Sequence, residues 1–143
     1  MISLDIDGTL IPAGCPVMRE DVKKELFRLT DKGYHIMLAT GRQLNNLQIL
    51  LPELSDKLYF GTENGSAVFG PGPEFELLDI TPMKREDALK IADIMMAQPD
   101  TEVSVSGANM QYIIPKSESF FTYMTETVKN RCTKISSWDE IQE

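Results

Sequence analysis

The chain has 143 residues, 42% of them hydrophobic and 25% charged, with a formal net charge of −8 at pH 7. These values suit one globular domain, or a core lobe with part of a second, and the negative charge disfavours nucleic acid and anionic membranes as partners. The two cysteines match neither a metal-binding spacing nor a disulfide framework. We find neither a signal peptide nor a long apolar run, and therefore expect a cytoplasmic protein.

Strand and helix patterns alternate through the first half of the chain, which predicts a parallel sheet built from β-α-β units. The predicted elements are strands at 2–5, 35–39 and 58–60, a helix at 21–32, and a helix marked by Leu44, Leu47 and Leu51. Residues 66–69 and 75–78 then flank a Gly-Pro-Gly-Pro loop that suits a hairpin. The strand at 35–39 is apolar enough to be buried on both faces of the sheet.

The pattern changes near residues 81–82. A helical stripe of Ala88, Ile91, Ala92 and Met95 is followed by alternating residues at 103–105 and 110–114, and then by a second helix face at 120–128. This α-β-β-α order does not continue the first sheet. We therefore place a boundary near residue 80, with one region at 1–80 and another at 81–143.

Two carboxylates, Asp5 and Asp7, stand at the end of the first predicted strand, before Gly8. Phosphate monoesters are anions that repel nucleophiles, so their hydrolysis needs charge neutralisation as well as a positioned attacking group. Mg²⁺ suits such a site because it typically takes one or two carboxylates together with water and substrate phosphate. We expect Asp5 and Asp7 to hold Mg²⁺, with Asp5 as nucleophile and Asp7 as general acid and base.

The close spacing of the two carboxylates should also raise the pKa of one of them. Gly8 allows a sharp turn, and backbone N–H groups at Gly8 and Thr9 could bind phosphoryl oxygens. An alternative interpretation of Asp7-Gly8 is a β-hairpin with residues 9–11 as its second arm, because Asp-Gly between apolar runs is a strong hairpin signal. The two interpretations are compatible.

A second polar motif, Thr40-Gly41-Arg42, follows the strand at 35–39. Open α/β sheets bind ligands at the C-terminal ends of their strands, so this motif should lie on the ligand-binding side. Gly41 permits close backbone approach, and the helix that begins near Arg42 directs its N-terminus toward an anion. The spacing leaves two roles open for Arg42, contact with the substrate or bracing of the helix start.

The run Asp5-Ile6-Asp7-Gly8-Thr9-Leu10, together with Thr40-Gly41-Arg42, resembles the haloacid dehalogenase-like hydrolases, in particular their Cof-type sugar-phosphate phosphatases. The resemblance implies an α/β fold, with an incomplete, Rossmann-like three-layer core at 1–80 and a partial α+β cap at 81–143. It also implies that Thr40 hydrogen-bonds the transferring phosphoryl group. Asn64, in a family-like Asn-Gly turn, would contact a substrate hydroxyl or the cap, or serve the turn only.

The function implied by this resemblance is Mg²⁺-dependent hydrolysis of a small phosphorylated metabolite, such as a sugar phosphate, through an aspartyl-phosphate intermediate. Two other functions stay open: an inactive module that binds a phosphorylated ligand or another chain, and a phosphomutase-type phosphotransferase. A metal-dependent glycosyltransferase is a weaker alternative, because only the Asp-x-Asp pattern supports it.

The resemblance covers only the front portion of the family. Members of the family carry a lysine after the cap and a Gly-Asp-x-x-x-Asp run that completes the Mg²⁺ site, whereas none of the nine glycines here precedes an aspartate. The Asp5 strand also has predicted neighbours on one side only, and soluble proteins avoid such a bare parallel edge. We therefore expect a truncated, inactive chain whose exposed sheet edge pairs with another chain or with a missing C-terminal portion.

Overall fold

The computed structural model describes residues 1–13, 15, 17–53, 56–108 and 110–141. The chain divides into two compact units, unit 1 at Met1–Pro82 and unit 2 at Met83–Glu143. The boundary expected from the sequence, at residue 80, lies two residues before this division. No helix among the described residues is long and apolar enough to cross a membrane.

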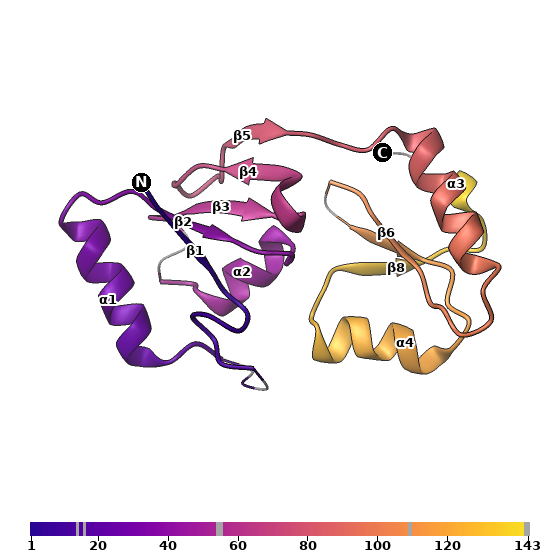
Figure 1. The fold of residues 1–143 in the computed structure, drawn as a ribbon, viewed down its shortest axis with the longest axis horizontal. Helices are drawn as coiled ribbons and strands as arrows, with labels where there is room; N and C mark the ends of the chain where they lie inside the picture. The colour runs from indigo at the N-terminus through magenta and orange to yellow at the C-terminus, as the bar shows by residue number, and fades with distance from the viewer. Residues whose placement is uncertain (14, 16, 54–55, 109, 142–143) are drawn as a thin grey trace. The chain divides into compact units, whose positions relative to one another are not determined.

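Unit 1 alternates strands and helices as the sequence predicts (Figure 1). Its elements are β1 (Ile2–Asp5), α1 (Glu20–Asp31), β2 (Ile36–Ala39), α2 (Leu44–Leu50), β3 (Tyr59–Thr62), η1 (Glu63–Gly65), β4 (Ala67–Phe69) and β5 (Leu77–Ile80). The five strands form one sheet in the order β1-β2-β3-β4-β5, in which β1, β2 and β3 are parallel and β4 and β5 are antiparallel additions. The predicted α/β architecture is confirmed.

The register between β1 and β2 places their last residues side by side. Ile2 pairs with Ile36, and Asp5 pairs with Ala39. Because parallel strands end at the same edge of a sheet, the loops that follow Asp5 and Ala39 leave the sheet together. This register brings the two polar motifs of the sequence to one edge.

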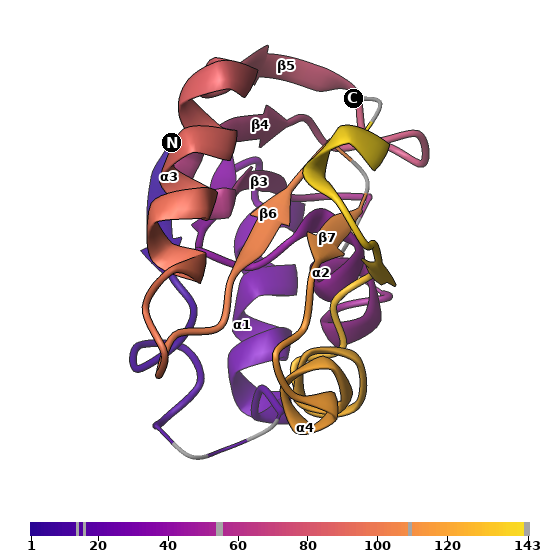
Figure 2. The same ribbon diagram turned by 90° about the vertical axis from the view of Figure 1, so that its right-hand side faces the viewer.

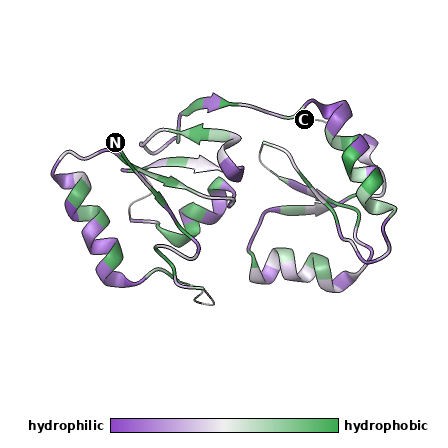
Figure 3. Ribbon diagram, in the orientation of Figure 1, coloured by the Kyte–Doolittle hydropathy of each residue, from purple (hydrophilic) through white to green (hydrophobic). Residues whose placement is uncertain are grey.

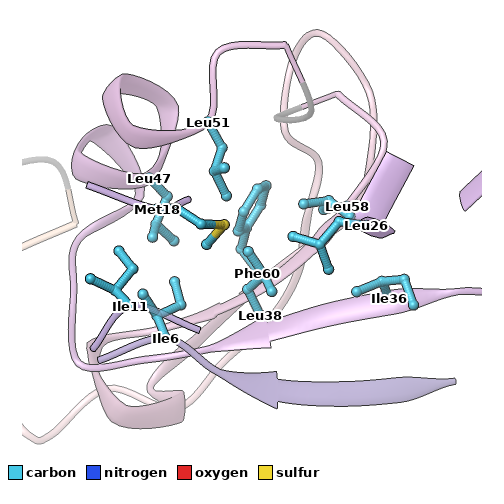
Figure 4. Packing of buried hydrophobic residues seen from close by; sticks show 10 residues of the cluster. All are labelled: Ile6, Ile11, Met18, Leu26, Ile36, Leu38, Leu47, Leu51, Leu58 and Phe60. Atoms are coloured by element: carbon cyan, nitrogen blue, oxygen red, sulfur yellow. The ribbon is translucent and has the colours of Figure 1, made fainter. Parts of the chain in front are cut away.

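The main apolar core of unit 1 lies between the sheet and its two helices. Figure 4 shows its ten buried side chains, which come from the strands, from both helices and from the loop after β1: Ile6, Ile11, Met18, Leu26, Ile36, Leu38, Leu47, Leu51, Leu58 and Phe60. Leu26 of α1 and Leu47 of α2 belong to the same cluster, so both helices cover the same face. Successive right-handed crossovers that progress in one direction along a sheet place their helices on one face.

The expectation that β2 is buried on both faces is wrong for this chain. Ile36 and Leu38 are fully buried against the helices, whereas Met37 and Ala39 on the opposite face are half-buried. Among the described residues of unit 1, no helix covers that second face, so the three-layer core implied by the resemblance is represented by two layers.

The sequence of α1 explains its place in this core. Glu20 and Asp21 lie in its first turn and Arg28 in its last, which complements the helix dipole. Figure 3 shows hydrophobic and hydrophilic residues alternating along the helix, and Leu26 is its fully buried residue. The chain then turns at Gly33, which has a positive φ of 82°.

Unit 2 begins with the predicted α-β-β-α order. Its elements are α3 (Arg85–Met96), β6 (Ser104–Ser106), β7 (Gln111–Ile113), α4 (Glu118–Thr122), the π-helical turn η2 (Tyr123–Thr127), β8 (Cys132–Lys134) and η3 (Trp138–Glu140). The sheet order is β6-β7-β8, with β7 antiparallel to β6 and parallel to β8. The sequence did not predict β8, because three residues with one apolar side chain give no readable strand pattern.

The buried face of α3 differs from the predicted stripe. Leu89, Ala92 and Met96 pack in the apolar cluster of unit 2, together with Trp138. Two members of the predicted stripe, Ile91 and Met95, are instead 49% and 41% exposed. The helix carries apolar residues on two sides, so periodicity did not identify the side that packs in the cluster. Figure 2 shows α3 alongside β6.

Candidate active site

The loop after β1 is a compact turn anchored by two buried side chains. Ile6 and Ile11 are both fully buried, and the Ile11 N–H donates to the Ile6 carbonyl at 2.8 Å. The only ladder contact in this loop, among the described residues, is one parallel bridge between Asp7 and Ile11. The alternative interpretation as a β-hairpin with residues 9–11 as its second arm is therefore wrong, because this bridge is parallel whereas the two arms of a hairpin are antiparallel.

Gly8 is needed in this loop for its backbone conformation. Its φ is +86°, a region that side-chain-bearing residues rarely adopt, although no atom lies within 4 Å of an added Cβ. The Gly8 N–H donates to the Ile11 carbonyl at 2.8 Å, and the Thr9 N–H donates to the Ile6 carbonyl at 3.3 Å. Both amides considered for phosphate binding are thus used within the loop in this structure.

Asp5 is the last residue of β1, and its side chain is exposed at the end of the sheet. The Thr9 hydroxyl donates a hydrogen bond to Asp5 Oδ2 at 2.9 Å. Because the loop closes tightly, Thr9 lies against the Asp5 carboxylate although it is four residues further along the chain. Thr9 therefore orients Asp5 in addition to any contact that it makes with a ligand.

Thr40 connects the loops that follow β2 and β3. It is 7% exposed, its N–H donates to the Gly61 carbonyl at 2.9 Å, and its hydroxyl accepts the Arg42 N–H at 3.2 Å. Its carbonyl accepts the Asn64 N–H at 3.0 Å. The two backbone hydrogen bonds fix Thr40 at the end of β2, and the third bond holds its hydroxyl against the Arg42 N–H.

Arg42 joins the two polar motifs directly. Its Nε donates to Asp7 Oδ2 at 2.8 Å and its Nη2 donates to Asp7 Oδ1 at 2.7 Å. The two residues thus form a bidentate ion pair, although they are 35 residues apart in the sequence. The Thr40-Gly41-Arg42 motif and the Asp5-x-Asp7 motif therefore meet at the same edge of the sheet, as predicted.

This ion pair sets the protonation of Asp7. The hydrogen bonds from Arg42 lower the pKa of the Asp7 carboxyl below its ordinary value, and the same contact raises the pKa of Arg42. The sequence-based expectation was that one of the two aspartates would have a raised pKa. For Asp7 this expectation is wrong in the structure, because a cation lies against its carboxylate.

Sequence reasoning did not identify Asn46 as part of the site. Asn46 lies on α2, is 4% exposed, and its Oδ1 accepts a hydrogen bond from Arg42 Nη1 at 2.6 Å. Asn46 stands four residues after Arg42, but Arg42 lies before the N-cap residue of α2, so the spacing rule for side chains on one helix does not predict this contact. The leucine pattern of α2 predicts the helix and gives no information about Asn46.

Gly41 and Asn64 lie against each other. A Cβ added to Gly41 would come within 2.9 Å of Asn64 Oδ1, so the glycine makes room for this side chain. Asn64 has a left-handed backbone with φ of 58°, as Asn tolerates in turns. The predicted turn role of Asn64 fits this conformation, and its proposed contact with a substrate hydroxyl stays a prediction.

A sequence profile of the haloacid dehalogenase-like hydrolases matches residues 2–143. The chain belongs to this family. The recognition of the family from Asp5-x-Asp7-Gly8-Thr9 and Thr40-Gly41-Arg42 is confirmed.

A curated relative matches the whole of this chain, and solved structures cover nearly all of it. It is 20% identical over 143 residues to the 5-amino-6-(5-phospho-D-ribitylamino)uracil phosphatase YbjI of Escherichia coli, a match to 100% of this chain and 52% of that protein. Solved structures include SMU.1108c from Streptococcus mutans, at TM-score 0.82 and 19% identity over 99% of this chain and 53% of that chain. The subclass IIB sugar phosphatase BT4131 gives TM-score 0.75 and 19% identity over 97% of this chain and 53% of that chain.

These likenesses confirm a haloacid dehalogenase-like fold. The chain spans about half the length of the curated relative and of the solved structures named above.

The carboxylates of this haloacid dehalogenase-like site fit Mg²⁺ in number and kind. Within the described ranges, no group of three or more His, Cys, Asp or Glu side chains could hold a metal ion. Asp5 and Asp7 are the two carboxylates that the sequence motif brings to this edge of the sheet. Mg²⁺ commonly uses one or two carboxylates and fills its other positions with water and substrate phosphate. The Asp7 side chain is 53% exposed, although both of its oxygens accept hydrogen bonds from Arg42.

Proposed function

We propose that this polypeptide forms the nucleophile-bearing part of a phosphatase that acts on small phosphomonoesters with the help of Mg²⁺. The observation that carries the proposal is the meeting of two motifs at one sheet edge, where Asp5 ends β1, Thr40 follows β2, and Arg42 binds Asp7. The family membership and the phosphatase names of the relatives support the same reaction class.

In the proposed reaction, a carboxylate oxygen of Asp5 attacks phosphorus while the bond between phosphorus and the ester oxygen breaks. The leaving oxygen takes a proton from Asp7, which later accepts a proton from the water that hydrolyses the phosphorylated Asp5. Thr40 would hydrogen-bond the transferring group, and Thr9 would keep Asp5 oriented. Mg²⁺ bound by Asp5 and Asp7 would neutralise negative charge on the phosphoryl group.

The role of Asp7 as a proton donor requires a change from the arrangement in the structure. A carboxyl whose pKa is lowered by a guanidinium is ionised at neutral pH and has no proton to give. For Asp7 to act as the acid in the proposed reaction, its carboxyl would have to gain a proton in the substrate complex, and Arg42, which holds the ionised form here, would have to move away from it. The structure supports bracing of the site by Arg42 more directly than contact with the substrate.

The substrate that we propose is a small phosphorylated metabolite such as a sugar phosphate, in a cytoplasmic compartment. The names of YbjI and BT4131 support this class, since one is a phosphatase of a phosphoribityl compound and the other a sugar phosphatase. A small monoester also suits a net charge of −8, because a larger polyanion would be repelled.

The proposal is tested by phosphate release from p-nitrophenyl phosphate with and without Mg²⁺. We would compare this chain with a version extended at its C-terminus to the length of the relatives. We expect turnover in the extended version and little in this chain, because the relatives have about twice the length.

Asp5→Asn in the extended version should reduce turnover by about a thousandfold or more, since an amide is a poor nucleophile toward phosphorus. Asn45→Asp, at a half-buried position of α2, serves as a matched exchange between amide and carboxylate and should retain activity. Undiminished turnover of the Asp5→Asn enzyme would eliminate Asp5 as nucleophile, and equal rates for the short and extended versions would refute the need for more chain.

We further propose that the free edge of β1 accepts a strand from additional polypeptide, either more of the same chain or a separate one. In the described sheet β1 pairs only with β2. A parallel edge strand beside a half-covered sheet face is a ready template for pairing. In the extended version, the β1 amides should exchange hydrogen more slowly than in this chain, and equal rates would contradict the proposed pairing.

A further inference from the structure

Asn46 is a buried polar residue in a helix that otherwise contributes apolar side chains to the core. It is 4% exposed, and its neighbour Leu47 is fully buried in the main apolar cluster. Burying an amide costs free energy unless the amide is hydrogen-bonded. The carbonyl oxygen of Asn46 accepts from Arg42 Nη1 at 2.6 Å, so the position of the amide is tied to the guanidinium.

The guanidinium of Arg42 is held on two sides. One side, through Nε and Nη2, faces the carboxylate of Asp7, and the remaining nitrogen, Nη1, faces Asn46. A guanidinium is planar and rigid, so fixing Nη1 fixes the direction in which the other two nitrogens point. The backbone N–H of Arg42 also donates to the Thr40 hydroxyl, which secures the start of the side chain.

From this geometry we infer that Asn46 is a positioning residue, which aims the Arg42 guanidinium at Asp7 and thereby fixes the Asp7 carboxylate beside the nucleophile. Asn46 lies on α2, Arg42 in the loop after β2, and Asp7 in the loop after β1. The chain of contacts therefore links the helix layer to the two loops that carry the site. The importance of this link for catalysis rests on the proposed phosphatase function, but the link itself does not.

The inference can be tested without substrate by ¹⁵N NMR of the Arg42 Nε–H group, assigned with Arg42→Lys. In the unaltered protein this proton is held by Asp7 and should exchange slowly with water. Asn46→Leu removes the acceptor while keeping a side chain of similar size. We expect the exchange of the Arg42 Nε proton to become about tenfold faster or more, the effect of a lost hydrogen bond to a charged group.

Two variants control for indirect effects. Asn46→Asp retains an acceptor oxygen, so the Arg42 Nε proton should still exchange slowly. Asn45→Leu changes the adjacent asparagine on α2, for which no contact with Arg42 occurs among the described residues, and the Arg42 Nε proton should again exchange slowly. If Asn46→Leu is not folded, Asn46→Ala takes its place, because alanine favours helix and adds no volume.

The inference is overturned if folded Asn46→Leu or Asn46→Ala leaves the Arg42 Nε exchange unchanged. It is also overturned if Asn45→Leu accelerates the exchange equally, or if both Asn46 variants lose the fold, since Asn46 would then support the helix and not the guanidinium. None of these outcomes depends on phosphatase activity, so failure of the inference and failure of the proposed function are separable.

Discussion

At Asp7, one side-chain contact changes the chemistry that the motif by itself predicts. Two neighbouring carboxylates should raise a pKa, yet a guanidinium held by Asn46 lowers the pKa of Asp7. Arg42 therefore has more influence on the protonation of Asp7 than the nearby carboxylate of Asp5 does. At the scale of single residues, the site in this structure holds Asp7 as an anion.

The Arg42–Asp7 pair predicts how stability depends on pH. A carboxyl whose pKa is lowered by folding stabilises the protein above its ordinary pKa, and this stabilisation is lost as the pH falls through the lowered value. Asp7→Asn should therefore be less stable than the unaltered protein at pH 7, by about 1 kcal/mol or less because the pair is partly exposed. The difference should shrink as the pH falls below about 4.

Urea unfolding of both proteins at pH 7 and at pH 3 measures this difference. If the two proteins differed in unfolding free energy by the same amount at pH 7 and at pH 3, the predicted pH dependence would be contradicted. Asp31→Asn is a suitable control, since the ion pair that Asp31 forms with Lys57 is long, at 3.4 Å, and exposed.

At the scale of elements, β2 is the middle strand of the parallel part of the sheet in unit 1. It pairs with β1 on one side and with β3 on the other, and it supplies Ile36 and Leu38 to the core. The same strand ends at Ala39, directly before Thr40, so the packing of its apolar residues determines where the polar motif stands. Stability and site geometry therefore depend on the same strand.

Leu38→Ala should destabilise unit 1 by about 2–5 kcal/mol, because it leaves a cavity in a fully buried part of the core. The matched control is Ile49→Ala on α2, which is 59% exposed and should change stability by less than about 0.5 kcal/mol. Chemical denaturation, monitored by amide exchange in β2, measures the change in unfolding free energy for both substitutions. Equal effects of the two substitutions would contradict the assignment of the core.

At the scale of the whole molecule, the residues that the structure describes form two apolar clusters, one in each unit. The single tryptophan of the sequence, Trp138, lies in the cluster of unit 2 and is 8% exposed. Its fluorescence therefore reports on the folding of unit 2. Because each unit has its own core, the two need not unfold in one transition.

Leu38→Ala should accordingly lower the unfolding midpoint of unit 1 and leave the transition in Trp138 fluorescence unchanged. Unit 1 is followed by amide exchange in β2, and unit 2 by fluorescence, in the same denaturant series. A fluorescence midpoint that shifts as far as the exchange midpoint would show that the two units unfold as one.

The elements of unit 1 and the residues of the site could largely be predicted from the sequence. Apolar periodicity and the turn residues defined β1, α1 and β2, and the two motifs stood where their strands ended. Unit 2 was harder, because β8 is too short for a pattern and α3 is apolar on two sides. Local patterns determine what an element is, but they contain little information about which neighbour it contacts.

The sequence by itself determined the family, the order of the strands and helices up to α4, and the positions of Asp5 and Thr40 at strand ends. All three depend on patterns of residues that lie close together along the chain. Only the tertiary structure decided that Arg42 binds Asp7, that Asn46 supports Arg42, and that both helices of unit 1 cover one face. The physical reason is distance: Arg42 and Asp7 are 35 residues apart, and a pairing of that range is fixed only when the sheet brings its strand ends together.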